Sequence, residues 1–124
     1  MTDTAAIRER FMRDPVPVRL GGLAANLARI RSFSEPPGHF EAVRQLIGES
    51  RMFVDLLVQD AGAELAAELC RLRDCLIWWE QGWPEIARRP DAVAALSVEA
   101  GQWSKRVLER SGLLNPHRST DSAA

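Results

Sequence analysis

Apolar positions recur along almost the whole chain with the spacing of an α-helix. The clearest case is the segment 63–82 and the residue that follows it, where apolar side chains succeed one another at intervals of 4, 3, 4, 3 and 4 residues. An α-helix has about 3.6 residues per turn, so this spacing places all of them on one face. The pattern predicts a helix that packs on neighbouring helices. These positions are Leu65, Leu69, Leu72, Leu76, Trp79 and Trp83.

The same spacing predicts four further helices. They span residues 5–13, from 15 to about 33, from about 37 to 60, and from about 90 to 112. Asp14 before Pro15 is a favourable start for the second of these helices, because aspartate caps free amides and proline fits the first turn. Gly82 and Pro84 predict the end of the helix over 63–82, since proline cannot donate a backbone hydrogen bond. Gly112 predicts the end of the last helix.

Length and composition agree with one folded domain. The chain has 124 residues, of which 46% are hydrophobic and 27% charged, as is ordinary for a soluble globular protein. Short connections make successive helices antiparallel neighbours. The expected fold is therefore all-α: an up-and-down four-helix bundle with a short extra N-terminal helix. The domain is expected to span residues 1–114, and the polar segment 115–124 is expected to be a disordered tail.

Charge and hydropathy limit the expected partners and compartment. The chain contains no apolar run long enough to cross a bilayer, which takes about 20 residues, and its first residues lack the apolar stretch of a secretory signal. The cytoplasm is therefore the expected location. A formal net charge of −1 argues against a nucleic-acid partner. Cys70 and Cys75 point roughly 140° apart on a helix, which predicts two buried thiols and no disulfide.

The segment 52–58 is apolar around most of its circumference, with Asp55 as its one polar residue. A helix of this kind is buried on several sides. It is either the central helix of the bundle or a helix that also contacts another subunit. A short buried strand is the competing interpretation, since periodicity alone does not separate the two. Met52, Phe53 and Leu56 are therefore candidate interface residues.

Trp78 is the other candidate for a protein interface. It falls on the polar face of the helix over 63–82, whereas the neighbouring Trp79 falls on the apolar face. A large aromatic side chain is costly to leave in water, and tryptophan is enriched among the residues that dominate binding energy. Either Trp78 docks a partner, or the first short helix covers it through Ile7 and Phe11.

Catalytic chemistry has little support in the motifs of the chain. There is no phosphate-binding glycine loop, no nucleophile elbow and no cluster of metal-ligating side chains, so we expect no metal and no cofactor. Arg110 and His117 are separated by six residues. This pair resembles the Arg and His element of HEPN-type helical-bundle ribonucleases and their non-catalytic relatives. The resemblance implies that Arg110 holds a phosphate and His117 transfers a proton, although Ser111 and Gly112 depart from the family's pattern.

Two functions follow from these observations. The first is a non-enzymatic helical interaction protein, which acts as an adaptor, an assembly factor or a small regulatory factor and forms a homodimer or binds another protein. In this case Leu56 and Trp78 both contact the partner. The alternative is a helical bundle that binds a small molecule or a nucleotide, with HEPN-like ribonuclease activity as its catalytic version.

Overall fold

The structure is a computed structural model that describes residues 4–35 and 38–113. Within these ranges the chain forms five α-helices and no β-strand, which confirms the all-helical prediction. The helices are α1 (Thr4–Arg13), α2 (Val16–Ser34), α3 (Phe40–Val58), α4 (Ala63–Ile86) and α5 (Pro90–Ser111). The alternative of a strand over 52–58 is wrong, since this segment lies inside α3. The predicted tail over 115–124 lies outside the described residues.

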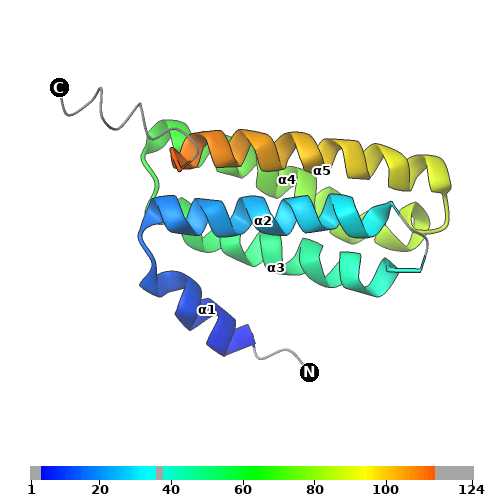
Figure 1. Ribbon diagram of the computed structural model, residues 1–124, viewed down its shortest axis with the longest axis horizontal. Helices are drawn as coiled ribbons and strands as arrows, with labels where there is room; N and C mark the ends of the chain where they lie inside the picture. The colour runs from blue at the N-terminus through cyan, green and yellow to red at the C-terminus, as the bar shows by residue number, and fades with distance from the viewer. Residues whose placement is uncertain (1–3, 36–37, 114–124) are drawn as a thin grey trace.

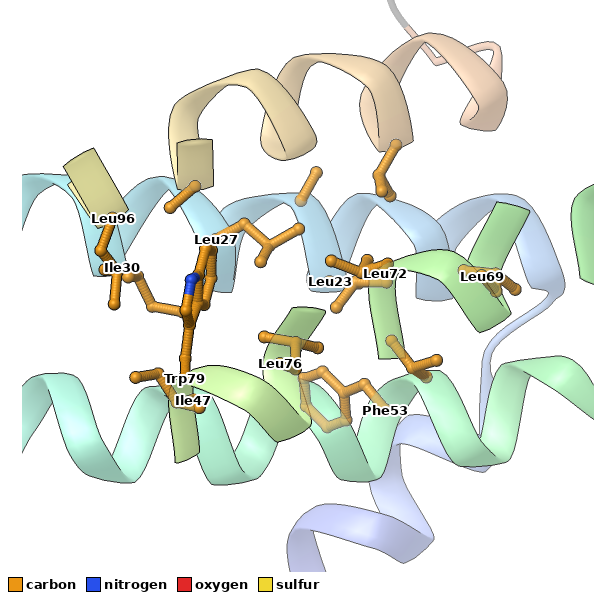
Figure 2. Packing of buried hydrophobic residues seen from close by; sticks show 14 of the residues in the cluster. Leu23, Leu27, Ile30, Ile47, Phe53, Leu69, Leu72, Leu76, Trp79 and Leu96 are labelled. Carbon is orange, nitrogen blue, oxygen red and sulfur yellow. The ribbon is translucent and has the colours of Figure 1, made fainter. Parts of the chain in front are cut away.

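Helices α2 to α5 run side by side, and α1 lies at an angle beside α3 (Figure 1). Helix α2 contacts both α3 and α5, while α4 contacts α3 and, to a smaller extent, α5. The core between these four helices is built from fully buried leucines such as Leu23, Leu27 and Leu76 (Figure 2). No helix among the described residues has both the length and the apolar character needed to cross a membrane.

Small residues bring α5 close to the backbone of α2. The Oγ atom of Ser104 donates a hydrogen bond to the carbonyl oxygen of Ala24 at 2.7 Å, and the Oγ of Ser97 donates to the carbonyl oxygen of Arg31 at 3.2 Å. Between them, a Cβ atom placed on Gly101 would lie 2.9 Å from Cδ of Arg31. Side chains of this size permit close helix packing, and the two hydroxyls fix α5 on α2.

The end of α4 differs from the sequence-based prediction. Gly82 and Pro84 were expected to end the helix, but α4 continues to Ile86. Proline removes one backbone donor, yet the helical hydrogen bonding resumes beyond it, because the amide of Ala87 donates to the carbonyl oxygen of Trp83 at 2.8 Å. Trp83 and Ile86 are both buried in the core. Their burial holds this last turn in place and outweighs the missing bond.

A buried arginine joins the start of α2 to the connection between α3 and α4. Arg19 is only 6% exposed, its Nη1 lies 3.0 Å from Oδ2 of Asp60, and its Nε donates to the carbonyl oxygen of Asp14 at 2.9 Å. Asp14 was predicted to cap the second helix. The prediction was wrong by one residue, because α2 begins at Val16 and Pro15 takes the N-cap position.

Candidate functional site

Trp78 is the most exposed large hydrophobic residue that the structure describes. Its relative exposure is 69%, against 3% for the adjacent Trp79. The two differ because successive residues of a helix point roughly 100° apart. Trp79 belongs to the core cluster with Ile47 (Figure 2), and Trp78 lies about a quarter turn away on the exposed face of α4. Helix α1 does not cover Trp78, since it packs on α3.

The other three predicted interface residues lie on α3 and are less accessible. Phe53 and Leu56 are buried, and Met52 is half-buried. The ring of Phe11 on α1 stacks on the ring of Phe53, with centroids 3.9 Å apart and an interplanar angle of 3°. Helices α1, α2 and α4 all contact α3, which accounts for the apolar character of segment 52–58. Trp78 is therefore the predicted interface residue that is most accessible to a partner.

A groove of about 390 Å³ lies next to Trp78, between α4 and α5. The space exists because some of the α5 residues that line it have small side chains. Apolar residues of α4 form its wall. Charged side chains stand at its edges. The α4–α5 groove is lined by Trp78, Trp79, Gly82, Glu85, Ile86, Arg89, Ala92, Ala95, Leu96 and Glu99.

Charged and polar residues flank Trp78 along the exposed face of α4. Arg71, Asp74, Trp78, Gln81 and Glu85 are all exposed, and their intervals of 3, 4, 3 and 4 residues place them on one side of the helix. They form the α4 outer strip. Apart from Trp78 its members were not predicted as interface residues, although their spacing from Trp78 was the available signal.

The charges of the α4 outer strip have few partners of their own. Arg71 forms no ion pair with any residue in the described part of the chain. Glu85 has one weak ion pair, to Arg88 at 3.8 Å, in which both side chains are 78% exposed. Exposed pairs of this kind contribute little to stability. The strip therefore presents Arg71 and Glu85 as charges available to a partner.

Cys75 lies on α4 one turn before Trp78, and its thiol donates a hydrogen bond to Oε1 of Glu99 at 3.4 Å. Both Cys75 and Cys70 are free thiols, and both are half-buried, less than the predicted burial. Desolvation of the thiolate, reinforced by the negative charge of Glu99, raises the pKa of Cys75 from 9.0 to about 12. The thiol is therefore held in its protonated form.

The raised pKa of Cys75 predicts slow alkylation. At about pH 8 the thiolate fraction falls about a thousandfold, while the higher basicity raises thiolate nucleophilicity about 20- to 30-fold. We expect iodoacetamide to modify folded Cys75 about 30- to 50-fold more slowly than the same cysteine in urea, as followed by peptide mass spectrometry. Glu99→Gln is expected to raise the rate in the folded protein. Equal rates with and without urea would contradict the raised pKa.

Two other cavities lie away from Trp78. One of about 710 Å³ lies where α2 and α5 meet the start of α3, with Phe40 and Val98 among its lining residues. The other, of about 400 Å³, lies between α1, α2 and α3. In the second cavity Asn26 donates to Glu49 at 2.9 Å, and Arg29 donates to Asn26 at 2.9 Å. These three polar side chains therefore satisfy one another.

The predicted ribonuclease pair is only half described. Arg110 contacts Glu68, with its Nη2 and its Nε each 2.9 Å from Oε2 of that carboxylate, so a phosphate would have to compete with Glu68. His117 lies outside the described residues. In the ranges that the structure does describe, no three His, Cys, Asp or Glu side chains gather to hold a metal ion.

Comparisons of the chain with protein-family models, with curated proteins and with solved structures gave no match. The function is therefore argued from the surface itself. The surface feature with the clearest unfavourable free energy is the side chain of Trp78, which is exposed to solvent beside the apolar α4–α5 groove.

Proposed function

We propose that this chain is a non-enzymatic helical interaction protein that self-associates through the α4 outer strip and the α4–α5 groove. The observation that carries the proposal is the 69% exposure of Trp78 beside an apolar groove. Tryptophan is one of the residue types enriched among binding hot spots, which lie in apolar surroundings within a polar rim. The charges of the outer strip supply such a rim.

The burial of Trp78 supplies a large part of the driving force for association. A tryptophan side chain buries roughly 150–250 Å², so at 69% exposure roughly 100–170 Å² remains to be covered. At about 25 cal/mol per Å², covering it contributes about 2.5–4 kcal/mol per copy. A two-fold dimer gains this twice, which offsets much of the entropy lost on association.

A second copy is the partner that the charges favour. A two-fold interface uses the same surface on both subunits, so that surface must be self-complementary. The outer strip has this property, because Arg71 lies on one side of Trp78 and Glu85 on the other.

We also infer that α2 to α5 form an up-and-down four-helix bundle. In that arrangement α4 presents one face to the core and leaves the outer strip for the second copy.

Sedimentation velocity and native mass spectrometry at about 10 μM test the proposal. The wild-type protein is expected to be a dimer and Trp78→Ala a monomer, because the variant removes the apolar anchor from both halves of the interface. Val98→Ala is the matched control, since Val98 is 58% exposed but lines the other cavity of α5. It is expected to remain a dimer.

Two results would overturn the proposal. One is a wild-type protein that stays monomeric up to about 100 μM. The other is a dimer that persists unchanged in Trp78→Ala. Circular dichroism of each variant checks that its helices are intact. Leu56→Ala is unsuitable as an interface variant, because Leu56 is buried in the core and its truncation acts on folding.

The cavities favour small-molecule binding as a second candidate function. Volumes of about 710 and 390 Å³ fall within the usual range of ligand pockets, roughly 300–1,000 Å³. A small-molecule mass retained in gentle native mass spectrometry would support this function. Its ribonuclease version stays a prediction, which metal-independent RNA cleavage lost in both Arg110→Ala and His117→Ala would support.

A further inference from the structure

We propose that the two copies pair through α4 in antiparallel orientation, with the two-fold axis beside Trp78, so that Arg71 of each copy contacts Glu85 of the partner subunit. This inference rests on the proposed self-association and specifies its geometry. It follows from the positions of three exposed residues on one helix face.

Arg71 and Glu85 are equally distant from Trp78 along α4. Each lies seven residues away, which corresponds to about 10.5 Å along the helix axis. Around the axis they lie roughly 20° to either side of Trp78. A two-fold axis perpendicular to α4 at Trp78 exchanges these two levels. The level of Arg71 in one copy therefore coincides with the level of Glu85 in the other copy.

The remaining polar residues of the strip fit the same arrangement. The two-fold operation brings Asp74 to within about 1.5 Å of the level of the partner's Gln81. Both lie on the same side of Trp78 around the helix, so the side-chain amide of Gln81 can donate to the carboxylate of Asp74. Every charge of the outer strip then faces an opposite charge or an amide donor.

Two other helix pairings bring like charges together. In a parallel pair Arg71, Asp74 and Glu85 each face the same residue of the other copy. An antiparallel pair with its axis between Trp78 and Gln81 brings Asp74 against Glu85 and Arg71 against Arg88. Like charges at an interface are unfavourable and select against such partners or registers. The register centred on Trp78 avoids them.

The direction of the tryptophan side chain agrees with this register. Helical side chains lean toward the N-terminus of their own helix. In an antiparallel pair this directs each Trp78 toward the C-terminal half of the partner's α4, where Gly82 lines the groove. A Cβ atom placed on Gly82 would meet nothing closer than Cδ1 of Ile86 at 3.5 Å. The groove beside Gly82 is therefore open to the partner's Trp78.

Charge reversal on α4 tests the register. Arg71→Glu and Glu85→Arg are each expected to raise the dimer Kd about tenfold or more at about 50 mM salt, because each variant creates two like-charge contacts per dimer. The double variant Arg71→Glu, Glu85→Arg is expected to restore the Kd to within about threefold of wild type. Sedimentation equilibrium measures all four proteins, and the differences are expected to shrink at about 500 mM salt.

A matched control and the pattern of failed results distinguish the proposed self-association from the proposed antiparallel register. Lys105→Glu makes the same charge change at an exposed position of α5 and is expected to leave the Kd unchanged. If the wild-type dimer is sensitive to Trp78→Ala but the double variant does not recover, the register is overturned and the proposed function stands. If the wild-type protein is monomeric, both proposals fail.

Discussion

Trp79→Ala is expected to lower the free energy of unfolding by about 3–5 kcal/mol, whereas the same change at the neighbouring Trp78 leaves it within about 0.5 kcal/mol. Trp79 is 3% exposed and belongs to the core cluster with Ile47 and Leu76 (Figure 2). Its truncation leaves a cavity that rigid helices fill only in part. Trp78 has no such role, because its side chain stands mostly in water.

Guanidinium denaturation followed by far-UV circular dichroism measures this difference. The protein is kept below about 1 μM, because dimer formation would otherwise add to the stability of the wild-type protein by mass action. Since small domains are stable by about 5–15 kcal/mol in total, Trp79→Phe serves as a milder variant if Trp79→Ala does not fold. Equal losses for the variants at Trp78 and Trp79 would contradict their assignment to surface and core.

Arg19→Ala is expected to lower the free energy of unfolding by about 2–3 kcal/mol. The variant removes an ion pair to Asp60 at 3.0 Å, a hydrogen bond to the carbonyl oxygen of Asp14, and a guanidinium group 6.0 Å from the centroid of the Phe11 ring. Asp60 is 44% exposed on its side chain. It regains water once the arginine is gone, which keeps the loss below that of a fully buried pair.

The same denaturation experiment provides a control within α1. Arg13 pairs with Glu9 at 3.0 Å, but the two side chains are 72% and 70% exposed. Arg13→Ala is therefore expected to cost less than about 0.5 kcal/mol. Arg19→Lys is expected to recover only part of the loss, since an ammonium group does not reproduce the forked donors of a guanidinium. A loss at Arg19 no larger than at Arg13 would show that this arginine is not a structural connection.

The helices were predictable because their signal is local. Spacing near 3.6 residues marked all five, and the apolar face of α4 is buried from Leu69 to Trp83. The end of α4 was not predictable, because it depends on the burial of Trp83 and Ile86 against other helices. Arg19 and Asn26 are buried for the same kind of reason. Their partners, Asp60 and Glu49, are distant in sequence, so the local pattern of polar residues cannot predict these contacts.

The candidate site was predictable only in part. Trp78 could be placed off the apolar face of its helix from spacing alone. Its exposure could not, because that depends on the docking of α1, and Phe11 stacks on Phe53 instead of covering Trp78. The same stacking contributes to the burial of Phe53 within the apolar segment 52–58. The α4–α5 groove depends on the separation of two helices, which a single sequence does not specify.

The close contact of α5 with α2 bears on the kinetics of association. Ser97 and Ser104 hydrogen-bond to backbone carbonyls of α2, so the wall that Ala92 and Ala95 form keeps its position in the free subunit. Two subunits that meet therefore need no opening step before they join. We expect an association rate constant of about 10⁵–10⁷ M⁻¹ s⁻¹, set by the orientation of each encounter. Changes at Trp78 then act on the lifetime of the dimer, and changes at the charged ends of the strip act on how often it forms.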